Sequence, residues 1–175
     1  MSAIGRFHVA AALLALIGAA MPLRAAKPQT SPAPAATLVV SGDIARPLSL
    51  TMADLKAMPR TTIVASSQGR DVKYEGVLIA EVLRRAGVPL GSDLAGPTVL
   101  ATYVLATAAD NYQVVFSLAE LDPATTGSEI MIADAADGQP MAMPQGPFKV
   151  VCPHDKRTAR AIRMLTKLEI VRLHK

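Results

Sequence analysis

The sequence has 175 residues, a net charge of +4 and a hydrophobic fraction of 51%, with one cysteine and no Trp. A single cysteine excludes an internal disulfide, so burial of an aliphatic core must hold the fold. The chain has no Gly-x-Ser-x-Gly motif, no phosphate-binding Gly-Lys-Ser/Thr loop and no His-Glu-x-x-His motif, which excludes these common hydrolase, nucleotide and zinc patterns. Its basic segments lack interleaved aromatic residues, so we expect no nucleic-acid partner.

Residues 1–26 have the pattern of a secretory signal peptide. Arg6 precedes an apolar run over residues 9–17, and small residues follow the run. The run is shorter than the roughly 20 apolar residues of a bilayer-spanning helix, although an uncleaved anchor stays open as the alternative. Cleavage is expected after a residue between 20 and 26, which predicts a periplasmic or secreted protein without a membrane span.

The mature chain is predicted to hold one folded domain. Residues 27–36, KPQTSPAPAA, are rich in Pro and Ala and predict a loose linker. Residues 37–175 follow, and their length suits a single hydrophobic core. No repeat with a period of about 20 to 50 residues is visible, which excludes a solenoid.

Charge is divided unevenly along this domain. Residues 86–148 contain seven acids and no Lys or Arg, whereas residues 149–175 contain eight bases and two acids. Such a separation favours an anionic ligand or partner at the basic end. Pairing of the bases with the acidic half in the fold is the alternative.

Short strands and helices alternate in the first half of the domain. Thr51 and Asp54 have capping-box spacing and predict the start of a helix that Pro59 ends. Apolar residues at helical spacing from Leu78, followed by Gly87, predict a second helix. The expected strands cover residues 37–42, 47–50, 61–66 and 72–77, and the expected helices cover residues 52–58 and 78–86.

The second half is predicted to be richer in strands. Asp110 and Asn111 separate two β-rich runs, residues 98–108 and 112–118, which predict a hairpin. Ser117 and Glu120 repeat the capping-box spacing over one turn. Further strands are expected over residues 129–134, 148–151 and 167–173, and a helical turn over residues 157–162. The sum predicts the α+β class, a mostly β mixed-sheet domain with two or three short helices.

Five segments resemble, in order, the successive motifs of the sulfite-oxidase-type molybdopterin-binding domain family. They span residues 37–173 and read LVVSGDIARPLSLTMADLKAMP, YEGVLIAEVLRRAGV, ADNYQVVFSLAEL, DGQPMAMPQGPFKVVCP and ARAIRMLTKLEI. The resemblance implies the α+β fold of that family. It also implies a molybdopterin cofactor, whose phosphate is held by basic groups and backbone amides, and a molybdenum bound by one cysteine thiolate.

The expected metal ligand is missing. The resemblance places the thiolate directly after the third strand, where residues 65–67 read Ala-Ser-Ser. A serine hydroxyl is a poor replacement for a soft thiolate. Cys152 lies far along the chain, at a position where the family usually has an apolar residue, and we interpret it as a small core residue. Cys152 and His154 supply at most two ligands of the about four that a closed site needs, so no metal site is predicted.

A basic segment carries the candidate cofactor-binding residues. Arg160 matches an arginine of the family, and Arg163 stands where a lysine is usual. Because residues three apart face one way on a helical turn, both guanidinium groups are expected to bind one phosphate, and Arg157 extends the positive surface. Gly146 matches a loop glycine that permits close approach to a ligand, and Asn111 lies in the family's hairpin turn. Exposed arginines that only solubilise a helix are the alternative.

The predicted signal peptide gives a second, independent reason to expect a protein without molybdenum. Members of this family that carry the metal cofactor cross the membrane folded, which requires a twin-arginine signal, and this leader has one arginine. We therefore expect an exported protein, without molybdenum catalysis, that binds an anionic ligand of the pterin-phosphate type or a periplasmic protein partner. Two alternatives stay open: a molybdopterin-dependent oxidoreductase with Ser66 or Ser67 as metal ligand, and a pure protein-interaction module.

Overall fold

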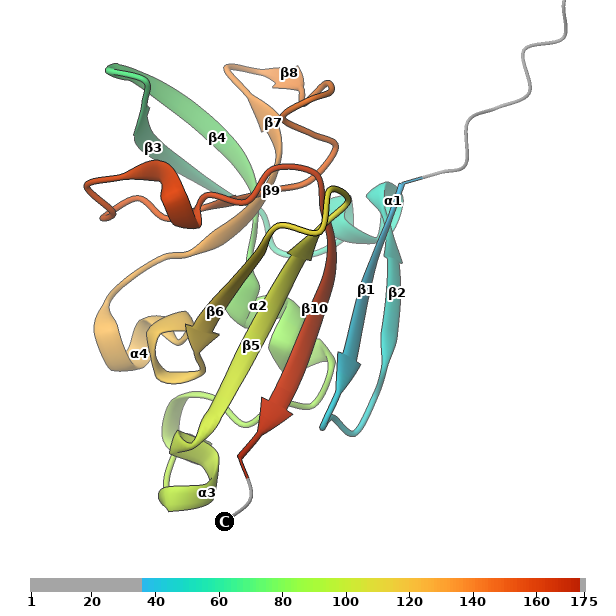
Figure 1. Ribbon diagram of the computed structural model, residues 1–175, viewed down its shortest axis with the longest axis vertical. Helices are drawn as coiled ribbons and strands as arrows, with labels where there is room; N and C mark the ends of the chain where they lie inside the picture. Colours follow the sequence, from blue (N-terminus) through green and yellow to red (C-terminus); the bar gives the residue numbers. More distant parts are fainter. Residues whose placement is uncertain (1–35, 174–175) are drawn as a thin grey trace, which may run out of the picture. The chain divides into compact units, whose positions relative to one another are not determined.

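The computed structural model describes residues 36–173, so the predicted signal peptide and nearly all of the predicted linker lie outside the described residues. Strands dominate this part of the chain, in two five-stranded sheets connected by short helical segments (Figure 1). The predicted α+β class with a mostly β core is thereby confirmed. Within residues 36–173, no helix has both the length and the apolar character that a membrane span requires.

Sheet A joins the two ends of the domain. Its strand order is β2 (Leu48–Thr51), β1 (Thr37–Gly42), β10 (Leu165–Arg172), β5 (Thr102–Ala108) and β6 (Gln113–Ser117). β1 pairs in parallel with β10, and the other pairs are antiparallel. Leu168 and Ile170 are buried in the core, while Lys167 and Glu169 alternate with them on the other face. Sheet A therefore has one core face and one face toward solvent.

Sheet B is antiparallel throughout. Its order is β3 (Thr61–Ser67), β4 (Arg70–Leu78), β7 (Met131–Ala136) and β8 (Gln139–Pro140), and β9 (Lys149–Val151) also pairs with β7. Gly76 of β4 lies so close to β7 that an added Cβ would stand 2.0 Å from the carbonyl oxygen of Ile132. Only glycine permits this approach, at the point where the register of the two strands shifts.

The helical segments are short. α1 (Met52–Lys56) begins with the predicted capping box, because the Asp54 amide donates to the Thr51 hydroxyl and the Thr51 amide donates to the Asp54 carboxylate. α2 (Ile79–Arg85) packs its apolar face into the core and lies behind sheet A in Figure 1. The other described helical segments are α3 (Pro97–Leu100), α4 (Pro123–Thr126) and the 3-10 turns η1 (Gly91–Asp93), η2 (Ala119–Leu121) and η3 (Thr158–Arg160).

The start of the predicted strand over residues 98–108 is wrong. Gly96 has a φ of +89°, and Pro97 occupies the first position of α3. Proline is favoured there because its fixed φ suits a helix start. The strand β5 consequently begins only at Thr102.

The predicted helical turn over residues 157–162 is also wrong beyond Arg160, where η3 ends. The Val150 amide donates to the carbonyl of Ile162 at 2.8 Å, and the Leu165 amide donates to the carbonyl in front of β9, that of Phe148, at 2.9 Å. These two bonds hold residues 162–165 beside β9. A helix therefore cannot continue through the segment.

Sheet B carries apolar side chains on both faces, which divides the core. Val150 of β9 packs into the main core together with α2 and sheet A. The next residue, Val151, belongs to a smaller second cluster, with Ile63, Ala65, Tyr74, Met131 and Ala133. Lys149 alternates with Val150 in the same way, and its Nζ lies 5.2 Å from the centroid of the Tyr74 ring. The Lys149 side chain therefore lies against the second cluster, over the Tyr74 ring.

Sheet B is also tied together by an ion pair. The Asp134 side chain is only 2% exposed, and Arg60 donates to both of its carboxylate oxygens, with Nη2 to Oδ1 at 2.8 Å. The two hydrogen bonds from Arg60 satisfy a carboxylate that water cannot reach, and they raise the pKa of Arg60. The pair connects the start of β3 to β7.

Replacing Arg60 with alanine should lower the free energy of unfolding by about 2 to 3 kcal/mol, because Asp134 stays buried without a partner. This value lies below that of a fully buried pair, since the Arg60 side chain is 33% exposed. Lys167→Ala, which breaks the exposed pair with Glu169, is the control and should cost less than about 1 kcal/mol. Urea unfolding measures both variants, and equal losses would contradict a dependence of Asp134 on Arg60.

Candidate functional site

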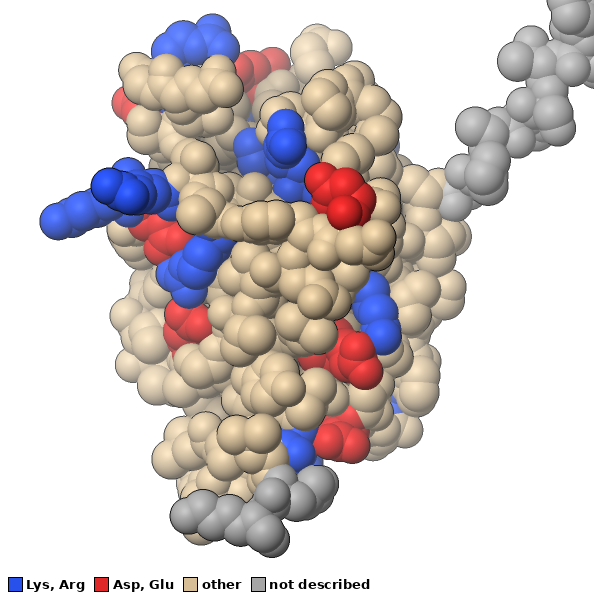
Figure 2. Space-filling model, viewed as in Figure 1, with Lys and Arg blue, Asp and Glu red and all other residues tan. Residues whose placement is uncertain are grey.

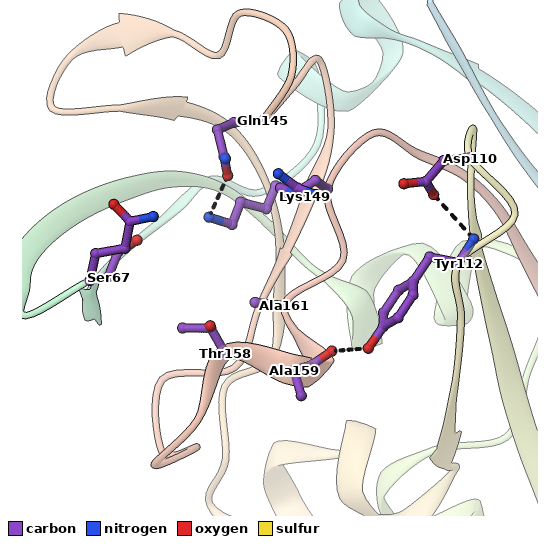
Figure 3. Close-up of a pocket in the computed structure, with 10 residues that line it drawn as sticks. Ser67, Asp110, Tyr112, Gln145, Lys149, Thr158, Ala159 and Ala161 are labelled. Atoms are coloured by element: carbon purple, nitrogen blue, oxygen red, sulfur yellow. Dashed lines mark hydrogen bonds between the residues drawn. The ribbon is translucent and has the colours of Figure 1, made fainter.

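A cleft of about 320 Å³, within the range of small-molecule sites, opens beside the second cluster. Four parts of the chain meet there: the β3–β4 turn, the loop before β9, η3 with the residues that follow it, and the β5–β6 turn. Figure 3 shows how these segments surround the cavity. The charged and amide side chains of its lining are Gln68, Asp110, Gln145, Lys149 and Arg163.

Lys149 is the central residue of this cleft. It is 7% exposed, and its Nζ donates to Gln145 Oε1 at 3.1 Å (Figure 3). It also donates to the Tyr74 hydroxyl at 3.3 Å. Both acceptors are neutral, and no carboxylate of residues 36–173 lies within 4.0 Å of the ammonium group. A buried ammonium without a counter-charge is costly, so the cleft favours an anion.

Sequence reasoning missed Lys149, although a signal for it was present. The residue lies inside the predicted strand over residues 148–151, whose other members are apolar. A lysine in a buried strand is rare unless it is paired, and the neighbouring sequence offers it no acid. A polar residue at a core position was therefore the clue.

A second cavity of about 320 Å³ adjoins the first. The two share Ser67, Gln68, Gln145 and Lys149, so they are lobes of one cleft that meet at the ammonium group. The second lobe adds one more base, Arg70, and apolar surface from the loop between β8 and β9. The cleft can therefore hold a ligand longer than a simple anion.

Arg163, one of the residues predicted from the sequence to bind the cofactor, lines the first lobe. It is exposed, and no described carboxylate pairs with it. The next residue, Met164, has a φ of +51°, and its carbonyl accepts from the Ala109 amide at 2.9 Å. Non-glycine residues seldom adopt this conformation, and they often mark functional sites when they do.

Arg160 has a different place. Its Nε and Nη2 donate to Asp155 at 2.9 and 2.7 Å, its Nη1 donates to Glu120 at 2.8 Å, and its guanidinium lies 5.3 Å from the centre of the Phe116 ring. The hydrogen bonds to Asp155 and Glu120 raise its pKa. Arg160 and Arg163 thus do not share a helical turn. The guanidinium group of Arg160 already makes hydrogen bonds to two carboxylates of the protein.

The other predicted residues border the cleft in different ways. Arg157 lines a small adjoining pocket. Gly146 is buried, and it lies close to the backbone of its own loop, where an added Cβ would stand 2.2 Å from the Met141 carbonyl oxygen. Asn111 turns the β5–β6 hairpin with a φ of +66° and lies outside the lining. The structure thus brings Arg163 into the cleft and leaves Asn111 at its edge.

The β5–β6 turn closes one wall of the cleft. The Tyr112 hydroxyl donates to the Ala159 carbonyl at 2.8 Å, and the Tyr112 amide donates to Asp110 at 3.1 Å (Figure 3). Figure 2 shows Lys and Arg side chains over the upper part of this face, with Asp and Glu side chains between them. The bases that line the two cavities are Lys149, Arg163 and Arg70, against one acid, Asp110, so the charge of the lining is mainly positive.

Cys152 packs partly against the main core, in line with its interpretation as a core residue. It also lines the small pocket with Ser66 and Ser67, a proximity that the sequence separation concealed. The free volume there is about 20 Å³, room for roughly one water molecule. The thiol donates to the Arg160 carbonyl at 3.9 Å, and burial raises its pKa to about 12.

Comparisons with known proteins agree with this architecture. A family model described as "Oxidoreductase molybdopterin binding domain" matches residues 25–174. The chain belongs to this family. The crystal structure of the sulfane dehydrogenase SoxCD from Paracoccus pantotrophus is similar, with a TM-score of 0.61 and 20% identity, over 77% of this chain and 38% of that one. The chain thus spans well under half of that protein, and the likeness concerns the fold. The comparison with curated proteins produced no match.

The donor chemistry does not fit the thiolate-bound molybdenum that the family resemblance implies. Ser66 and Ser67 offer only hydroxyl groups, and the Cys152 thiol donates to the Arg160 carbonyl beside a free volume of only about 20 Å³. Lys149 and Arg163, by contrast, fit the phosphate of a molybdopterin.

Alkylation of Cys152 should be slow in the folded protein. At about pH 8, a thiol of pKa about 12 is ionised in roughly one molecule in ten thousand, against roughly one in four at pKa about 8.5. We expect iodoacetamide to react at least about a hundredfold more slowly with the native protein than with the same chain in denaturant. Mass spectrometry follows the reaction, and similar rates in both states would contradict the burial of a neutral thiol.

Proposed function

We propose that this domain binds an anionic ligand of the pterin-phosphate type in its cleft, and that it does so without a thiolate-bound molybdenum. The observation that carries the proposal is the buried ammonium group of Lys149, which has no carboxylate partner within residues 36–173. Its burial costs several kcal/mol unless a counter-charge is present. An anion in the cleft supplies that charge.

Phosphate suits the cleft better than a carboxylate does. Its oxygens can accept from the Lys149 ammonium and from both arms of the Arg163 guanidinium at once. One carboxylate, Asp110, also lines the cleft and accepts a hydrogen bond from the Tyr112 amide. A ligand that joins a phosphate to a ring with N–H donors, as a pterin phosphate does, uses both kinds of group.

Binding of phosphate should depend on Lys149 and Arg163, the two cations that line the first lobe. Lys149→Met should abolish binding of a pterin monophosphate without lowering the melting temperature, because methionine fills a similar volume and removes a buried charge. Arg163→Gln should weaken binding at least about tenfold. Isothermal titration calorimetry measures both, with the unphosphorylated pterin as ligand control. Unchanged affinity in Lys149→Met would refute the site assignment.

Arg160→Gln is the matched control for these variants. Its guanidinium lies outside the cleft lining and holds Asp155 and Glu120. The variant should therefore retain the ligand and lose about 1 to 2 kcal/mol of stability. The opposite pattern, lost binding with full stability, would restore the paired-arginine site expected from the sequence.

Molybdenum content tests the second half of the proposal. Protein purified from its native compartment should contain molybdenum far below one atom per chain, as inductively coupled plasma mass spectrometry can measure, because Ser66 and Ser67 are hard donors and the Cys152 thiol is bonded to the Arg160 carbonyl. A stoichiometric amount would favour the oxidoreductase alternative, with Ser66, Ser67 or a deprotonated Cys152 as ligand.

We also propose that the protein acts after export, in the periplasm or outside the cell, as its leader sequence suggests. A protein partner is the second candidate ligand, because Arg70, Lys156 and Arg157 are exposed without an ion pair among the described residues. Contacts through such exposed charges weaken steeply with ionic strength. A ligand held by the buried Lys149 responds much less to salt.

A further inference from the structure

Gln145 holds the ammonium group at the point where the two lobes of the cleft meet. Its Oε1 accepts from Lys149 Nζ at 3.1 Å, and its side chain lines both lobes. Its backbone is fixed as well, because its amide donates to the Ala142 carbonyl at 3.0 Å and its carbonyl accepts from the Met164 amide at 3.4 Å. The side chain therefore starts from a constrained position beside Lys149.

A carboxylate of the same size would fit in this position and would neutralise Lys149. Glutamate differs from glutamine in one atom, and its oxygen could accept the same hydrogen bond with a full negative charge. An amide instead orients the ammonium group and leaves its charge available. The other charged groups that line the two lobes are Arg163, Asp110 and Arg70, none of which bonds to Lys149.

We propose that Gln145 is the positioning residue that makes this cleft selective for anions, because it holds the ammonium group of Lys149 without compensating its charge. The bound oxyanion then acts as the missing counter-ion. This inference rests on the proposed function, and it identifies which neutral side chain sets the charge of the site.

The test compares Gln145→Glu with Gln68→Glu, using sulfate as the probe. Sulfate keeps its charge between about pH 3 and pH 8, so only the protein titrates. Gln68 lines the same two lobes but does not bond to Lys149, so its variant adds the same charge to the cleft without pairing. We expect Gln145→Glu to weaken sulfate binding at least about tenfold more than Gln68→Glu, with a melting temperature no lower than that of the unmodified protein.

A pH profile separates charge pairing from structural damage. A carboxylate paired with Lys149 has a pKa below the usual value of about 4.3, so it is charged at neutral pH and becomes neutral as the pH falls below about 4. The affinity deficit of Gln145→Glu should therefore shrink on acidification. A deficit that stays constant with pH, or an equal deficit in Gln68→Glu, would overturn the inference.

The outcomes for the unmodified protein separate the two proposals. If it binds sulfate and Gln145→Glu binds equally well, the role of Gln145 is wrong while the anion site stands. If the unmodified protein binds neither sulfate nor a pterin monophosphate, the anion site itself is wrong, and this inference falls with it.

Discussion

The ammonium group of Lys149 is held by two neutral oxygens beside an aromatic ring, and no described carboxylate approaches it. Its positive charge is therefore not neutralised by a neighbouring acid. Because water is largely excluded from this position, the attraction between the ammonium group and an anion that enters the cleft is stronger than it would be in water. Arg163, the other cation that lines the first lobe, also has no carboxylate partner among the described residues. Arg160, the cation with three hydrogen bonds to acids, lies outside the lining.

Strand pairing explains why Lys149 and Arg163 lie together. The short strand β9 pairs with β7 along one edge, and the bond from Val150 to the carbonyl of Ile162 holds the later segment along the other. Alternation along β9 sends Val150 into the main core and Lys149 to the opposite face. Arg163 directly follows the residue that pairs with β9. Backbone hydrogen bonds therefore bring the two cations to the same end of the cleft.

Local signals predicted much of the fold and little of the site. The capping box at Thr51 and the β5–β6 hairpin depend on residues close in sequence, and both are confirmed. The pairing of residues 162–165 with β9 depends on partners that no local pattern specifies, so the helical expectation there is wrong. The same non-local contacts separate Arg160 from Arg163 and bring Gln145 to Lys149. Sequence could identify an unusual lysine in a buried strand, but not the neutral residue beside it.

The missing thiolate and the uncompensated charge of Lys149 are linked by position. Ser67 lines both lobes of the cleft and the small pocket, and Lys149 lines all three as well. A thiolate at residues 65–67 would place a negative charge near the ammonium group and would compete with an incoming anion. Hydroxyl groups there leave Lys149 uncompensated and can themselves donate hydrogen bonds to an oxyanion. The serines at positions 66 and 67 therefore bear on both halves of the proposed function, the missing metal ligand and the binding of an anion.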